Sequence, residues 1–134
     1  MTEQINPIAK RMLEEWKKGM LTYWTLSLLV LTPMYGLEIK KEIEETTSGK
    51  LRLGVSTMYQ LLRRLEKKGL VKSRWEQTKT GPPRAYYEVT EAGKTVLRTY
   101  VSEVLSPDSP IFKAIGNLTQ KMILKLHQEK RNKQ

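Results

Sequence analysis

A dense cluster of basic side chains between residues 50 and 84 is the part of the sequence best suited to bind a charged partner. The segment holds ten lysine and arginine residues against two acidic ones, Glu66 and Glu76, and this surplus of eight supplies most of the net charge of +10. Basic side chains beside phosphates release condensed counterions, so they bind polyanions with an affinity that falls as salt rises. A charge run alone is also typical of a solvated surface. The ten residues are Lys50, Arg52, Arg63, Arg64, Lys67, Lys68, Lys72, Arg74, Lys79 and Arg84.

A helix beginning at Val55 is predicted to carry part of this charge on one face. Its apolar residues recur at three- and four-residue steps, which places them on the opposite, buried side; they are Met58, Leu61, Leu62 and Leu65. Gly69 can take the left-handed conformation that closes a helix, with Leu70 packing back over the last turn. We therefore expect the helix to end near Lys68.

Two strands are predicted directly after this helix. Side chains alternate over Val71–Thr78 and again over Arg84–Val89, as they do in half-buried strands. The link from Lys79 to Pro83 makes a basic, proline-stiffened hairpin tip. A helix followed at once by a basic hairpin is typical of winged-helix proteins that bind duplex DNA.

The proportions of the predicted helix suit the major groove of B-DNA, which admits one α-helix. The short side chains of Ser56 and Thr57 would let the backbone approach the duplex, while longer side chains farther along would reach it. Two of the predicted contacts have structural alternatives. Tyr59 could cover the core instead of contacting DNA, and Arg84 could belong to a hairpin that is merely solvated. The predicted DNA contacts are Ser56, Thr57, Tyr59, Gln60, Arg63, Arg64, Lys67, Lys79, Thr80 and Arg84.

Composition limits the other functions open to the chain. Its 134 residues suffice for one domain with helical extensions, and it has no cysteine for a disulfide, a thiolate metal site or a nucleophile. The longest apolar stretch, Leu26–Leu31, is far shorter than a membrane span, and the first residues do not resemble a secretory signal. We therefore expect a cytoplasmic protein with no membrane association. No catalytic constellation, cofactor motif or metal-ligand spacing appears, so an enzyme is not expected.

The remaining core is predicted to be helical with one more short strand. A helix over Met20–Leu31 is apolar nearly all round, and a second over Gly36–Thr47 turns Ile39 and Ile43 inward. Leu51–Leu53 are expected to add a strand to the hairpin, in the order α-α-β-α-β-β. The predicted fold is mainly α with a small β-hairpin wing. The expected parts are an N-terminal helix (1–18), a winged helix-turn-helix domain (19–93), and C-terminal dimerisation helices with a basic tail (94–134).

Three apolar stripes outside this core predict a homodimer. They precede the core, follow it, and continue after a break at Ser106–Pro110. Exposed apolar patches of this extent are rare on monomers, and twofold pairing is the commonest oligomer; the alternative is that the helices fold back on their own core. The predicted interface residues are Ile8, Met12, Trp16, Leu97, Tyr100, Val101, Val104, Ile111, Ile115, Leu118 and Met122.

Three linked segments resemble the PadR family of transcriptional regulators. They are MYGLEI at residues 34–39, STMYQLLRRLEKKGLV at 56–71 and GPPRAYYEVTEAG at 81–93. The similarity extends from about Gly19 to about Leu97. Two positions depart from the family pattern: Leu37 replaces a usual aromatic residue, and Ala85 replaces a usual basic one.

This resemblance implies a homodimeric winged-helix repressor that binds a pseudo-palindromic operator. An effector of unknown identity that changes the angle between the two wings would release the DNA. The resemblance places the family's threonine and tyrosine on Thr57 and Tyr59, its basic pair on Arg63 and Arg64, and its wing arginine on Arg84. Three tryptophans, Trp16, Trp24 and Trp75, could line an effector pocket, but large aromatic residues at helical or strand spacing are more often core residues, so no ligand is assigned to them. The main alternative function is a winged-helix adaptor that binds an acidic protein without reading DNA.

Overall fold

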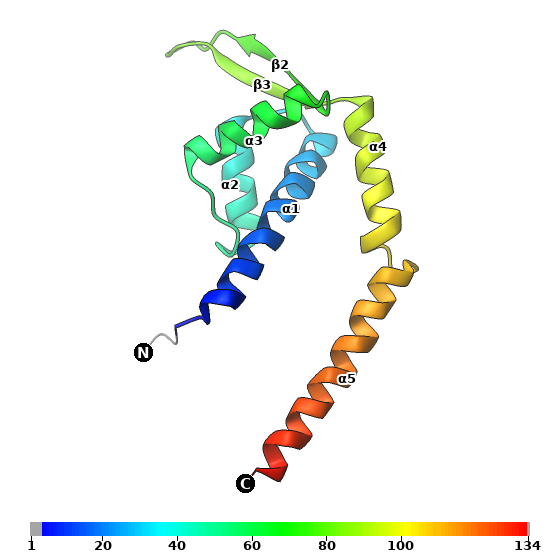
Figure 1. Ribbon diagram of the computed structural model, residues 1–134. Coiled ribbons are helices and arrows are strands. Elements are labelled where there is room, and N and C mark those ends of the chain that lie inside the picture. The colour runs from blue at the N-terminus through cyan, green and yellow to red at the C-terminus, as the bar shows by residue number, and fades with distance from the viewer. Residues whose placement is uncertain (1–3, 134) are drawn as a thin grey trace. The chain divides into compact units, whose positions relative to one another are not determined.

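The computed structural model describes residues 4–133, which divide into two compact units between Thr95 and Val96. The architecture is mainly helical with one small sheet, as the sequence predicted (Figure 1). In chain order the elements are α1 (Pro7–Leu31), β1 (Met34–Tyr35), α2 (Gly36–Thr46), α3 (Val55–Lys67), β2 (Val71–Glu76), β3 (Arg84–Val89), α4 (Glu91–Tyr100), the π-helical turn η1 (Val101–Leu105) and α5 (Pro110–Asn132).

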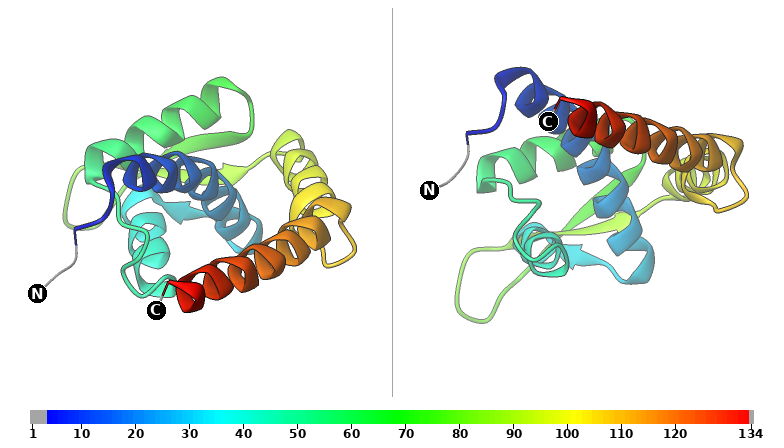
Figure 2. Two further views of the ribbon diagram at one scale, coloured as in Figure 1. Left: turned by 60° about the horizontal axis from the view of Figure 1, so that its bottom comes forward. Right: turned by 90° about the horizontal axis from the view of Figure 1, so that it is seen from below.

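The first unit packs three helices with a three-stranded antiparallel sheet in the order β1-β3-β2. Helix α2 packs against α3, and α1 contacts both α2 and β3. Figure 2 shows these helices from two further directions, with the β2–β3 loop extending past α2 in the right-hand view. The apolar core of this unit is formed by Leu26, Leu28, Leu29, Ile39, Ile43, Leu51, Leu53, Met58, Leu61, Leu62, Leu65, Val71 and Tyr87.

Helix α1 is continuous where the sequence predicted two elements. It begins at Pro7 after Asn6, whose side-chain oxygen accepts hydrogen bonds from the backbone of Ile8 and Ala9. The predicted boundary between residues 18 and 19 lies inside this helix. A single glycine in a helix costs only about 1 kcal/mol relative to alanine, so Gly19 does not end the helix. The first half of the helix is exposed, whereas its buried residues, including Leu26 and Leu29, lie near its end.

The third strand is not where the sequence placed it. Leu51–Leu53 form no strand, so that prediction was wrong; Leu51 and Leu53 are instead buried core side chains. The alternation there arose from packing and not from a β-ladder. The third strand is β1, in which Met34 lies opposite Tyr87 and Tyr35 lies opposite Tyr86. A strand of two residues is too short to show a period in the sequence.

The end of α3 confirms the predicted glycine stop. Gly69 has a positive φ of 75°, a conformation that glycine adopts without steric cost. The Leu70 amide donates to the Leu65 carbonyl, and the Gly69 amide donates to the Glu66 carbonyl, which is the Schellman arrangement. This tight closure leads straight into β2, so it sets the position of the hairpin relative to α3.

The register of the hairpin decides which side chains face the helices. Val71 pairs with Val89, Ser73 with Tyr87 and Trp75 with Ala85, so these pairs share one face of the β2–β3 ribbon. The side chains of Val71 and Tyr87 are buried on that face. The intervening pairs are Lys72 with Glu88, Arg74 with Tyr86 and Glu76 with Arg84, on the opposite face.

A short joint connects the end of α3 to the start of α4. The Thr90 hydroxyl donates to the Gly69 carbonyl at 2.6 Å and accepts from the Gly93 amide at 3.1 Å. The Thr90 amide also donates to the Leu70 carbonyl. Thr90 therefore caps α4 and holds its first turn against the closure of α3.

We predict that Gly93→Ala destabilises the protein. A Cβ at Gly93 would lie 2.3 Å from the Leu70 carbonyl oxygen and 2.7 Å from Val89 Cγ2. Because the first of these atoms is backbone, the joint must move, and the free energy of unfolding should fall by about 1–3 kcal/mol. Thermal or urea unfolding measures this change.

Gly19→Ala is the matched control for this prediction. Its new Cβ meets nothing within 4 Å, and alanine is favoured over glycine inside a helix by about 0.5–1 kcal/mol. The control should therefore unfold at a higher temperature than the parent protein. Equal stabilisation by Gly93→Ala would contradict the close packing at the joint.

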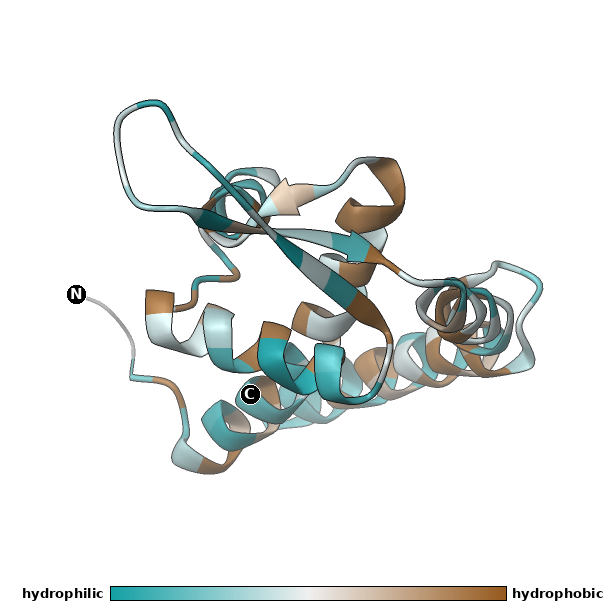
Figure 3. Cartoon of the chain, turned by 90° about the horizontal axis from the view of Figure 1, so that it is seen from above, coloured by the Kyte–Doolittle hydropathy of each residue, from teal (hydrophilic) through white to brown (hydrophobic). Residues whose placement is uncertain are grey.

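The second unit contains α5 and the turn before it. The predicted break is confirmed: α5 starts at Pro110, and the Ser109 hydroxyl accepts from the Phe112 amide while donating to the Glu103 carbonyl. Figure 3 shows hydrophobic and hydrophilic residues interspersed along α5. Its large apolar side chains are exposed along the whole helix; they are Ile111, Phe112, Ile115, Leu118, Met122, Ile123, Leu124 and Leu126.

Within residues 4–133, no helix has both the length and the apolar composition needed to cross a bilayer.

Candidate nucleic-acid interface

The outer face of α3 presents the polar side chains that the sequence assigned to DNA contacts. All of them are exposed except Tyr59, which is half-buried. Successive helix residues are about 100° apart, so Tyr59, Arg63 and Glu66 face one side, and Arg64 lies on the other flank. The exposed members of the set are Ser56, Thr57, Gln60, Arg63, Arg64 and Lys67.

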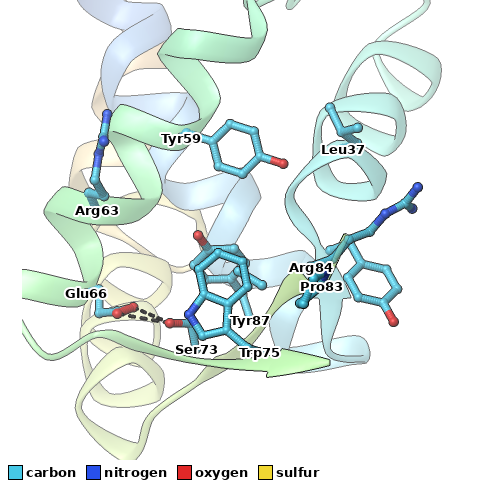
Figure 4. Close-up of a pocket in the computed structure, with 11 residues that line it drawn as sticks. Leu37, Tyr59, Arg63, Glu66, Ser73, Trp75, Pro83, Arg84 and Tyr87 are labelled. Atoms are coloured by element: carbon cyan, nitrogen blue, oxygen red, sulfur yellow. Dashed lines mark hydrogen bonds between the residues drawn. The ribbon is translucent and has the colours of Figure 1, made fainter. Parts of the chain in front are cut away.

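Tyr59 lies against the start of α2. A Cβ on Gly36 would come within 2.8 Å of the Tyr59 ring, so the glycine makes room for the tyrosine. The ring projects from α3 toward Leu37 (Figure 4). Tyr59 thus contributes to packing between α2 and α3 and also borders the surface beside the wing.

One face of the wing is neutralised by its own acidic residues. The Arg74 guanidinium donates to Glu88 at 3.0 Å and to Glu76 at 3.2 Å, and Lys72 lies 3.8 Å from Glu88. Arg74 also lies over the Tyr86 ring, 5.0 Å from its centroid. These contacts pair two of the ten clustered cations inside the hairpin, so the charge available to a partner lies elsewhere.

Tyr35 fastens β1 to this network. Its hydroxyl donates to Glu76 at 2.8 Å, and its ring packs edge-on against Tyr86. The hydrogen bond to the Glu76 carboxylate raises the pKa of the Tyr35 phenol, with burial acting in the same direction. The Tyr35 hydroxyl therefore links β1 to the wing through Glu76.

Eight of the ten clustered cations form no ion pair within residues 4–133, and six of these eight lie on α3, directly after its end or at the wing tip; the other two, Lys50 and Arg52, precede α3. The six are exposed, and none forms an ion pair with any residue between 4 and 133. Arg84 lies 5.9 Å from the Tyr35 ring centroid, which orients its guanidinium without cancelling the charge. This set comprises Arg63, Arg64, Lys67, Lys68, Lys79 and Arg84.

A cavity of about 480 Å³ separates α3 from the wing, and we call it the wing groove. Figure 4 shows Arg63 on α3 and Arg84 on the wing at its two sides, with the Trp75 indole between them. The Ser73 hydroxyl donates to Glu66 at 2.8 Å, which ties the wing to α3. The groove is lined by Tyr35, Leu37, Tyr59, Arg63, Glu66, Ser73, Trp75, Pro83, Arg84, Ala85 and Tyr87.

Two features of the wing groove were missed in the sequence. Trp75 was assigned to the core, yet its side chain is 74% exposed, so that assignment was wrong. The alternation of β2 places Trp75 on the same face as the buried Val71. The sequence does not show that no helix covers this face at the position of Trp75. The hydrogen bond between Ser73 and Glu66 joins β2 to α3, and no local sequence pattern in either element indicates it.

Burial raises the pKa of the Tyr87 phenol at the base of the groove.

The residues assigned to a dimer interface differ in exposure. Leu97 is buried, with 9% of its surface exposed, and Tyr100 and Val104 are half-buried. The others are exposed, from Ile8 at 73% and Leu118 at 70% to Val101 at 40%; they include Met12, Trp16, Ile111, Ile115 and Met122. The two longest exposed apolar stripes are therefore those of α1 and α5. Within the described part of the chain, no cluster of three histidine, cysteine or acidic residues is placed to hold a metal ion.

Comparisons with known proteins find similar sequences and similar folds. An uncharacterised protein, protein X of Lysinibacillus sphaericus, is 33% identical over 86 residues, covering 64% of this chain and 79% of that protein. A PadR family transcriptional regulator from Eggerthella lenta is 29% identical, with a TM-score of 0.61 and coverage of 89% of this chain and 91% of that one.

The fold also matches that of Bacillus subtilis PadR, whose crystal structure was determined in complex with operator DNA. The TM-score is 0.58 at 23% identity, over 84% of this chain and 63% of that one. The model of the transcriptional regulator PadR-like family matches residues 25–99, which are more than half of the 134 residues and include α2, α3, the wing and most of α4. The chain belongs to the PadR-like family of transcriptional regulators.

Proposed function

We propose that the protein is a homodimeric repressor that binds a pseudo-palindromic operator in double-stranded DNA. The observation that carries this proposal is the gathering of exposed, unpaired cations on α3 and the wing tip, beside a wing face whose charges are internally neutralised. A surface that is charged only for solubility would not need its unpaired cations on α3 and the wing tip and its ion pairs on the other face of the wing. Family membership and the operator complex of the B. subtilis protein support the same function.

In this proposal the exposed face of α3 enters the major groove. Gly54 precedes the helix, and Ser56 and Thr57 occupy its exposed first turn, so the backbone can approach the duplex closely. Gln60, Arg63 and Arg64 then reach base edges, where arginine pairs with guanine and glutamine with adenine. Lys67, Lys79, Thr80 and Arg84 contact the flanking phosphates, which position the protein without reading sequence.

The exposed apolar stripes of α1 and α5 supply the dimer contact in this proposal. Twofold pairing would place the two copies of α3 about 34 Å apart, in successive major grooves on one side of the duplex. The operator is then an inverted repeat. Occupancy of a promoter would block transcription by exclusion, and an effector that changes the angle between the two wings would release the DNA.

Salt dependence of binding tests the proposal against a protein-binding adaptor. We expect a fluorescent duplex to bind at low ionic strength, with log K falling linearly against log salt at a slope of about −0.9 for each phosphate neutralised. Polyglutamate, an acidic chain without helical grooves, should compete far more weakly than unlabelled duplex. A flat salt profile, or equal competition by polyglutamate and duplex, would favour the adaptor and contradict the proposal.

A further inference from the structure

Trp75 is a large aromatic side chain that the fold leaves largely in solvent. The residue is 74% exposed, and its cross-strand neighbour on the same face is the small Ala85. No acceptor among residues 4–133 bonds the indole N–H. Tryptophan offers a broad apolar surface and a single donor, and here both are open to a partner.

The chemistry around the indole varies along the wing groove. At one end the carboxylate of Glu66 is held by the Ser73 hydroxyl. Arg63 and Arg84 stand at the two sides of the groove, exposed and without acidic partners. A ligand that fits must therefore present anionic or hydrogen-bond-accepting groups to the two arginines and an apolar group to the indole, and must keep its anions away from Glu66.

The sugar–phosphate backbone of one DNA strand has this alternation of charged phosphate and largely apolar deoxyribose. With α3 in the major groove and the wing over the adjoining minor groove, the strand that separates the two grooves runs between these elements. The wing groove occupies this place in the fold. This step rests on the proposed function, since it takes the bound orientation of α3 from it.

We propose that Trp75 is a DNA-backbone contact, in which the indole ring packs on a deoxyribose and its N–H donates to a phosphate oxygen. Arg84 neutralises a neighbouring phosphate from the wing side of the groove, while Arg63, on the α3 side, reaches past the backbone to a base edge. Such a contact positions the duplex without reading its sequence. Loss of Trp75 should therefore weaken binding to every duplex by the same factor, whereas loss of a base-reading side chain changes sequence preference.

Fluorine NMR of the full chain tests the contact in the protein with its own sequence, and a variant is needed only to assign the resonance. Labelling with 5-fluorotryptophan gives one resonance each for Trp16, Trp24 and Trp75, and the resonance absent from Trp75→Phe identifies Trp75. On addition of duplex, the Trp75 resonance should shift, and its solvent isotope effect between H₂O and D₂O should shrink. The resonances of Trp16 and Trp24, both on α1, should keep their solvent isotope effects.

Affinities of two variants separate the ring from its donor. Trp75→Phe keeps an aromatic ring but loses the N–H, so we expect about fivefold weaker binding. Trp75→Ala loses both and should bind more than roughly tenfold more weakly, to the operator and to unrelated duplexes alike. Gln77→Ala, an exposed residue just beyond β2, is the control and should bind like the parent protein.

Three results would overturn the proposal. If the parent protein binds duplex with salt sensitivity but the Trp75 resonance and the affinity of Trp75→Ala are unchanged, Trp75 is not a contact and the proposed function survives. If Trp75→Ala weakens binding to one sequence only, the indole reads bases and the backbone assignment is wrong. If the parent protein binds no duplex, both this inference and the proposed function fail.

Discussion

Replacing Arg63 and Arg64 together with alanine is expected to abolish high-affinity DNA binding. Each side chain should contribute about 1–3 kcal/mol if it contacts a base edge, so the double variant should lose at least about 2 kcal/mol, or roughly 30-fold, in affinity. The two arginines lie on different flanks of α3, with Arg63 beside the wing groove and Arg64 facing away from it. The single variants should therefore relax sequence preference at different operator positions. Binding curves against a panel of operator variants measure both effects.

Lys41→Ala is the matched control, because it removes one exposed positive charge from α2. It should leave sequence preference unchanged and alter affinity little. Neither arginine forms an ion pair within residues 4–133, so the substitutions should not unfold the protein, which circular dichroism checks. Parental affinity in both single variants would mean that the wrong face of α3 has been chosen.

Introducing a charge at Leu118 of α5 is expected to convert the proposed dimer into monomers. Ile111, Ile115, Leu118 and Met122 follow one another at four-, three- and four-residue steps, so they form a single exposed stripe. A glutamate at Leu118, 70% exposed in the single chain, would be buried in the proposed interface, and burying an unpaired charge costs several kcal/mol. Sedimentation should show monomers, and binding to an inverted repeat should fall to the level of one half-site.

Gln120→Glu adds the same charge on the side of α5 opposite this stripe, about 180° away. This control should remain dimeric and bind the inverted repeat like the parent protein. A dimeric Leu118→Glu variant would remove α5 from the interface. Monomers in both variants would indicate that total charge, and not the stripe, governs assembly.

Periodic segments with clear end signals were predicted well from the sequence. The apolar steps at Met58, Leu61 and Leu65 and the stop at Gly69 defined α3, because helix period and the left-handed glycine are local properties. The hairpin followed from alternation on both sides of a proline-rich turn. The exposed polar face of α3 then followed from the position of its apolar face, since both belong to one helix.

Features set by contacts between distant segments were not predictable. β1 exists because Met34 and Tyr35 pair with β3 of the hairpin. A segment of two residues carries no sequence pattern that predicts this pairing. The alternation over Leu51–Leu53 had the right period for a strand but reflected burial in a loop. Trp75 was misassigned for a related reason: strand alternation gives the face of a side chain, but not how far the helices extend beneath it.

Selection of bound duplexes from a random pool, read by sequencing, tests the central claim most directly. We expect enrichment of an inverted repeat whose half-sites are centred about one helical turn apart or a multiple of that distance. The Arg63→Ala and Arg64→Ala variants should select altered half-sites. A pool that remains unenriched at low ionic strength, or enrichment of a sequence that does not change when both arginines are removed, would contradict the claim that the outer face of α3 reads duplex DNA.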